Sequence, residues 1–138
     1  MPKFIVDFFP NVANYWDIFL TALTATHQMF FIAGLLTLLI GGALGISLIV
    51  TKTDGIKPNR IIHFILEVIT NVFRAVPFII LLIFLIPLTR SIAGTSIGVK
   101  GAVVPLVFGA VPFYTRQVET ALADVNPGKI EAARSMGS

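Results

Sequence analysis

The sequence has no cysteine among its 138 residues, which excludes a disulfide framework, a thiolate metal site and a cysteine nucleophile. Charged residues are also scarce: they make up 12% of the chain, against about 25% in an ordinary soluble protein. The phosphate-loop pattern G-x-x-x-x-G-K-[ST] is missing, as are a nucleophile elbow and a paired-carboxylate constellation. We therefore predict that the chain is not an enzyme, with no catalytic residue, no cofactor and no metal ligand.

Apolar side chains, by contrast, make up 56% of the residues. A domain of this size keeps a large share of its surface exposed, so a water-soluble fold could not hide them. A lipid bilayer is the solvent that suits this composition. The net charge of +3 is too small and too dispersed for a nucleic-acid groove. His27 and His63 have no partners at metal-ligand spacing, and we expect both to be ordinary interfacial residues.

Three apolar segments are long enough to span a bilayer as helices. Residues 30–50 form an uncharged run of 21 residues, which as a helix covers about 30 Å, the thickness of the hydrocarbon core. We predict an all-α membrane protein, a polytopic bundle with spans at about 28–50, 61–88 and 101–120 and loops at 51–60 and 89–100. The second span is longer, as a straight helix, than the thickness of a bilayer core, so its first turns should protrude into the interface or line a wet cavity.

The spans divide the chain into three parts. Residues 1–26 mix aromatic side chains with two aspartates, which is typical of the headgroup region, and we expect an interfacial segment there. Residues 27–123 form the transmembrane domain in this prediction. Residues 124–138 are polar and helix-patterned and should lie outside the membrane.

The distribution of basic residues predicts the orientation. With three spans, the 51–60 loop and the tail share one side, which holds six Lys and Arg residues, while the opposite side holds three. Because cytoplasmic loops carry an excess of Lys and Arg, we place the 51–60 loop and the tail in the cytoplasm and the N-terminus outside. The two groups are Lys52, Lys57, Arg60, Arg116, Lys129 and Arg134 on one side, and Lys3, Arg90 and Lys100 on the other.

The tail should form a short helix over residues 127–136. Asn126 followed by Pro127 is a common helix start, and Gly137 is a natural stop. A helix of about ten residues is marginal alone in water, so it must dock against something. The residues alone leave two interpretations open: a docking helix, or an interfacial turn between two spans.

The residues of this tail also resemble a known motif. Glu131, Ala132, Ala133 and Gly137 match the EAA loop of ABC importer permeases, whose signature is Glu-Ala-Ala, three residues, then Gly. FRAVPF at 73–78 resembles the Phe-Arg-x-x-Pro turn of amino-acid importer permeases. Residues 87–113, with their Thr-Arg…Gly-Thr-x-Ile-Gly pattern, are similar in particular to methionine importer permeases. The resemblance covers roughly residues 27–138.

That resemblance implies a translocation subunit in the bacterial cytoplasmic membrane that moves an amino acid such as methionine. It implies that the tail is a coupling helix, in which Glu131, Ala132, Ala133 and Gly137 contact a separate ATP-binding subunit. Further implied partners are a second permease copy, an extracytoplasmic substrate-binding protein or lipoprotein, and membrane lipid, with no nucleic acid. Such permeases have about five spans and continue past the EAA loop, so we expect a truncated chain.

Three polar residues inside the second span form a second candidate site. Glu67, Asn71 and Arg74 lie at i, i+4 and i+7 and so share one helix face. A charge at the centre of a spanning helix costs about 2.5–3.5 kcal/mol, so such residues tend to face protein or water. They are candidates for lining the translocation path, or they snorkel to the interface. Glu67 could reach Arg74 through Asn71, or each could pair with another helix.

Two other features have more than one interpretation. Pro77 and Pro112 each remove a helix hydrogen bond, which either kinks a span or frees a carbonyl toward a cavity. Gly41 and Gly45 form a small-x-x-x-small pattern, which we assign to helix packing. The alternative to an ABC permease is a secondary carrier, for which Glu67 is the candidate titratable group, or a small structural membrane protein.

Overall fold

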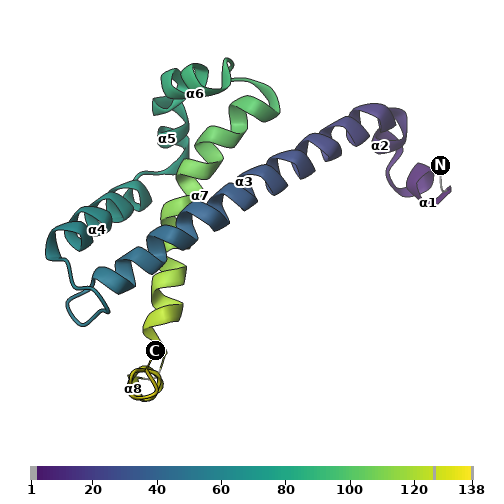
Figure 1. Cartoon of the computed structure of the whole chain (residues 1–138). Helices are drawn as coiled ribbons and strands as arrows, with labels where there is room; N and C mark the ends of the chain where they lie inside the picture. Colours follow the sequence, from purple (N-terminus) through teal and green to yellow (C-terminus); the bar gives the residue numbers. More distant parts are fainter. Residues whose placement is uncertain (1–2, 126, 138) are drawn as a thin grey trace.

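A computed structural model describes residues 3–125 and 127–137, and this part of the chain is helical, without β-strands. The prediction of an all-α fold is therefore confirmed. Figure 1 shows the longest helices crossing, with shorter helices on one side of them and at both ends of the chain. The helices are α1 (Lys3–Phe8), α2 (Pro10–Asn14), α3 (Trp16–Thr51), α4 (Arg60–Ala75), α5 (Phe78–Phe84), α6 (Ile86–Ala93), α7 (Gly98–Ala123) and α8 (Pro127–Ser135).

The longest element, α3, is one continuous helix of 36 residues. At 1.5 Å per residue it measures about 54 Å, well beyond the roughly 30 Å of a hydrocarbon core. The sequence predicts an interfacial segment up to residue 26 and a span from about residue 28, whereas α3 runs through that boundary without a break. Residues 16–27 contain neither glycine nor proline, so nothing in them ends a helix.

A stripe of small residues on α3 brings it against α7. The buried positions of α3 are spaced four or three residues apart, so they lie on one face. A Cβ built on Gly45 would lie 2.6 Å from the Val118 Cβ, and one on Gly41 would lie 2.9 Å from the Tyr114 ring. The two backbones can approach this closely only because both positions lack a side chain. The stripe consists of the small residues Ala33, Thr37, Gly41 and Gly45, and the buried Leu48 continues the same face.

The second apolar segment is broken rather than straight. Between α4 and α5 the chain axis turns by 105°. Val76 is extended, with ψ 123°, and Pro77 caps α5 without a side-chain hydrogen bond. Since a residue before proline is pushed out of the α region, the helix ends at Ala75. The prediction of one span over 61–88 thus corresponds to α4, α5 and the start of α6.

The predicted loop at 89–100 is shorter than expected. Helix α6 continues to Ala93, and Gly94 ends it in the left-handed region with φ 74°. Only residues 94–97 lie between α6 and α7. Pro112 falls within the continuous helix α7, as Pro105 does, and so does not end it.

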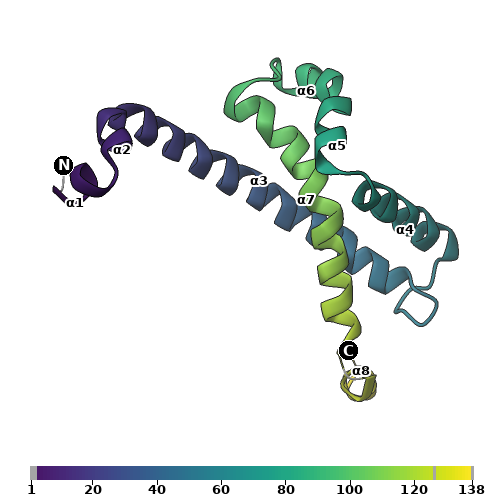
Figure 2. The same cartoon turned by 180° about the vertical axis from the view of Figure 1, so that it is seen from behind.

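Among the described residues, two helices, α3 and α7, are long and apolar enough to cross a membrane, and the bent α4–α5 pair makes a third if it counts as one span. Figure 2 shows the arrangement from behind: α7 crosses α3, and α4, α5 and α6 follow one another beside α7. Many large apolar side chains on these helices remain exposed, for example Phe30, Phe84 and Ile61 at 70%, 78% and 73%. In a bilayer, lipid and neighbouring helices would cover them.

Candidate functional site

The tail helix α8 begins at Pro127, after the end of α7 at Ala123, and lies beyond that end (Figure 1). It spans Pro127–Ser135, one residue shorter than the predicted 127–136. Gly137 has φ 86°, which favours glycine, and its N–H donates to the Arg134 carbonyl at 3.1 Å, as expected of a helix stop. The predicted N-cap Asn126 lies outside the described residues.

The side chains singled out on α8 are available to a partner. Glu131 and Ala132 are exposed, and Ala133 is half-buried. Ile130 and Met136 are apolar, yet 42% and 79% exposed. A helix of nine residues with one carboxylate, two alanines and uncovered apolar groups can insert into a cleft, because its small residues permit close approach.

A hollow of about 500 Å³ separates α8 from the membrane helices. Its walls come from the end of α3, the loop after it, the end of α7 and α8 itself. Ile49, Leu122 and Ile130 line it together with the charged Lys52 and Arg134. The loop after α3 and the tail helix, which the charge distribution assigns to one side of the membrane, thus lie at the same end of the structure (Figure 1).

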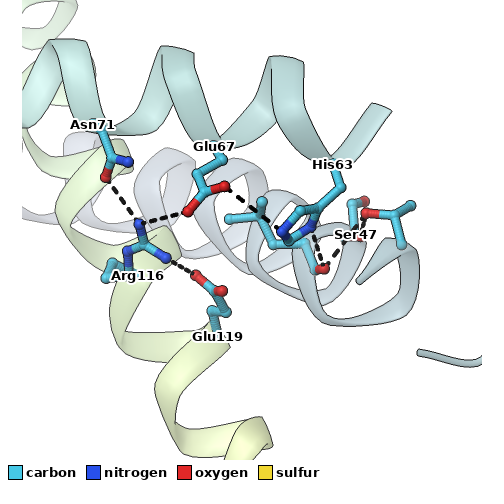
Figure 3. Close-up of polar contacts among 8 residues, drawn as sticks. Ser47, His63, Glu67, Asn71, Arg116 and Glu119 are labelled. Carbon is cyan, nitrogen blue, oxygen red and sulfur yellow. Dashed lines mark hydrogen bonds and ion pairs between the residues drawn. The ribbon is translucent and has the colours of Figure 1, made fainter. Parts of the chain in front are cut away.

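Arg116 on α7 is the centre of a polar cluster that reaches α4 (Figure 3). Its guanidinium donates to Asn71 Oδ1 at 2.9 Å and to Glu119 Oε2 at 2.5 Å, and lies 3.8 Å from Glu67 Oε1. The Arg116 side chain is 26% exposed and Glu119 14%, so the cluster is partly shielded from solvent. The i, i+3 spacing of Arg116 and Glu119 on one helix favours their pair, whereas no sequence spacing indicates the link from Arg116 to α4.

His63 extends the cluster toward α3. Its Nε2 lies 3.8 Å from Glu67 Oε2, and its Nδ1 lies 3.1 Å from the Leu48 carbonyl oxygen. The second contact joins α4 to α3 across 15 residues of sequence. His63 is therefore more than an ordinary interfacial residue: it joins two helices. The Nδ1 of the other histidine, His27, lies 2.8 Å from the Leu23 carbonyl oxygen of its own helix.

Of the three polar residues predicted to share one face of α4, the structure brings two into this cluster. Glu67 and Asn71 both contact Arg116 on α7. Glu67 therefore pairs with another helix, and not with Arg74 of its own helix. Arg74, two turns from Glu67, makes no hydrogen bond or ion pair within residues 3–125 and 127–137. It lines a groove beside the α4–α5 break instead. The same described residues contain no group of His, Cys, Asp and Glu that could hold a metal ion.

Comparison with known proteins identifies the family. The family model for the binding-protein-dependent transport system inner membrane component matches residues 41–138. The chain belongs to this family. Membership of an inner-membrane family is in keeping with the apolar helices of this chain, which are long enough to cross a membrane.

Relatives of this inner membrane component include the D-methionine transport system permease protein MetI of Yersinia pestis and of Escherichia coli strain K12. Each is 46% identical over 113 residues, which are 82% of this chain and 52% of the relative. The probable MetI of Vibrio cholerae is 43% identical over 122 residues, or 88% of this chain and 54% of that protein. The chain thus spans about half the length of the curated relatives it matches.

Solved structures of a related transporter have a similar fold. Two crystal forms of the MetNI methionine ABC transporter in inward-facing conformations superpose with TM-scores of 0.80 and 0.83, at 45% and 44% identity. They cover 84% and 86% of this chain, which corresponds to 54% and 55% of the matched chains. The fold of this chain is therefore that of part of a MetI-like permease.

Proposed function

We propose that this chain is a translocation subunit of an ABC importer for a methionine-type amino acid, energised by ATP hydrolysis on a separate subunit. The observation that carries the proposal is α8: a short helix with exposed Glu131, placed after α7 in a chain 46% identical to MetI permeases over 113 residues. Within the described residues α8 buries little of itself, so a partner is needed to stabilise it.

In the proposed mechanism α8 is a coupling helix. It inserts into a cleft of the ATP-binding subunit, with Glu131, Ala132 and Ala133 on its contact surface and Gly137 ending the helix. Closure of that subunit on ATP moves α8 and with it α7. Because α7 packs tightly on α3 at Gly41 and Gly45, the motion passes to both long helices. Alternating access by rigid-body motion would follow.

The proposal includes an orientation and a set of partners. The 51–60 loop and the region 124–138 lie in the cytoplasm, the region 27–123 lies in the membrane, and the N-terminus lies outside, as the basic residues indicate. A second permease copy completes the path, and an extracytoplasmic binding protein or lipoprotein delivers the amino acid. The polar face of α4, with Glu67, Asn71 and Arg74, borders the path. Glu67 and Asn71 also tie α4 to Arg116.

The test is co-purification with the cognate ATP-binding subunit. Glu131→Arg should weaken the association at least tenfold, because it reverses the one carboxylate on α8 and adds a long side chain. Gly137→Pro should do the same, because proline cannot adopt the φ of 86° found there. Asp7→Arg is the matched charge reversal, on the exposed helix α1, and should leave the association unchanged.

Unchanged association after both tail substitutions would overturn the proposal, provided that the variants still insert into the membrane. Methionine uptake driven by an ion gradient, with no ATP-binding subunit present, would instead support a secondary carrier. Glu67 would then be the residue to test, since it lies inside the polar cluster (Figure 3).

A further inference from the structure

One groove of the molecule combines a single cation with a wall of apolar side chains. It lies beside the α4–α5 break and has a volume of about 460 Å³, within the range of small-molecule pockets. Among the described residues that line it, Arg74 in the last turn of α4 is the one with a charged group. The remaining lining is Phe73, Val76, Phe78, Leu81, Leu106, Gly109, Ala110 and Phe113.

Glycine and alanine shape the α7 side of this groove. A Cβ on Gly109 would lie 2.9 Å from the Phe78 ring, so the absence of a side chain there allows α5 to pack close to α7. Ala110 is exposed and presents only a methyl group. The groove thus exists because small residues on α7 lie opposite the aromatic residues of α4 and α5.

The guanidinium of Arg74 has no partner among the described residues. The two acceptors on its own helix face, Glu67 and Asn71, are occupied by Arg116 from α7. Arginine carries five N–H donors, no acceptor and a permanent charge. In an apolar groove such a group favours an anion that accepts two parallel hydrogen bonds, and a carboxylate has that geometry.

We propose that this groove binds an amino acid with an apolar side chain, with its carboxylate on Arg74 and its side chain against Phe73, Phe78 and Phe113. The inference rests on the proposed function and extends it by naming the group that holds the substrate. The groove volume suits one short side chain better than the two acyl chains of an anionic phospholipid, whose phosphate would otherwise suit Arg74. An amino acid is therefore the occupant that we assign.

The experiment measures modification of Arg74 by phenylglyoxal in the full chain, in nanodiscs of phosphatidylcholine. Arg90 on α6 serves as the internal reference, because it lies outside the groove lining and its Nε donates to Ser96 Oγ. Saturating methionine should slow modification of Arg74 about threefold or more relative to Arg90, since a bidentate carboxylate masks the guanidinium. Methioninamide, which lacks the carboxylate, should give no protection, and glycine should give far less than methionine.

A variant tests the apolar wall. Ala110→Phe fills the groove but leaves Arg74 in place, and it should abolish protection by methionine. Equal protection by methionine and methioninamide, or protection that survives Ala110→Phe, would overturn the inference. So would protection by phosphatidylglycerol in nanodiscs without methionine, which identifies a lipid as the occupant. None of these outcomes depends on the ATP-binding subunit, so failure here is distinct from failure of the co-purification test.

Discussion

Arg116 on α7 donates a hydrogen bond of 2.9 Å to the amide oxygen of Asn71 on α4, across 45 residues of sequence. The same guanidinium lies 3.8 Å from Glu67, one turn earlier on α4. Because α7 leads directly to α8, this contact ties the first half of the broken span to the helix that we propose as the coupling element (Figure 3). A movement of α8 would therefore reach α4 through polar contacts as well as through packing.

The first prediction concerns the strength of that tie. A double-mutant cycle with Arg116→Gln and Asn71→Ala should give a coupling energy of about 0.6 kcal/mol, typical of hydrogen bonds between membrane helices. Reversible unfolding of the chain in mixed SDS and mild detergent, followed by circular dichroism, measures it. The control cycle pairs Asn71→Ala with Arg90→Gln and should give a coupling energy of zero. Arg90 is a suitable control because its Nε donates to Ser96 Oγ and not to α4. Equal coupling in both cycles would disprove the contact.

The second prediction concerns the crossing of α3 and α7. Gly45→Ala should lower the free energy of unfolding by about 1–3 kcal/mol, because the added methyl group would meet the Thr115 carbonyl oxygen at 2.8 Å and the Val118 side chain. Gly42→Ala is the matched control, with nothing within 4 Å of its Cβ. It should be neutral or stabilise the helix by up to about 1 kcal/mol, since alanine is the better helix former. If the two variants behave alike, α3 does not pack on α7 through this face.

The third prediction concerns the bend between α4 and α5. Spin labels at Ile61 and Phe84, both exposed, report its geometry by pulsed dipolar spectroscopy. A straight helix would separate the two positions by about 35 Å. The 105° turn at Val76 and Pro77 should give a clearly shorter distance. A distance near that of the straight helix would show that residues 61–84 form one rod.

The sequence predicted the local elements well, because local patterns determine them. The uncharged run at 30–50 lies within α3, and the tail helix and its glycine stop lie where the start and stop signals put them. Residues 16–27 are as helix-competent as the rest of α3, so no local signal separates the predicted interfacial segment from the span. Pro77 suggested a disturbed helix at this point. The angle of the bend, however, depends on how Phe78 and Leu81 pack against α7, and no local sequence pattern contains that information.

The candidate site was predicted less completely, for a related reason. The i, i+4 and i+7 spacing placed Glu67, Asn71 and Arg74 on one face of α4, but it could not say which of them would meet another helix. The partner of each residue on this face of α4 depends on how α4 packs against α7. Arg116, the partner of Asn71, is 45 residues away in sequence, so no local spacing connects the two. His63 was missed for the same reason, since its partner is a backbone carbonyl, which has no sequence signature.

The fourth prediction concerns the side of the membrane on which α8 lies. The chain has no cysteine, so a single introduced cysteine is the only thiol available to a membrane-impermeant maleimide. Glu131→Cys should react in inside-out vesicles and not in intact cells. Thr95→Cys, in the turn between α6 and α7, is the control and should react in intact cells.

Labelling of Glu131→Cys is also the most direct test of the central claim, that α8 is a cytoplasmic coupling helix. We predict rapid modification from the cytoplasmic face of the membrane. Modification of Glu131→Cys from the outside of intact cells would contradict this account, because no cytoplasmic ATPase could then reach the helix.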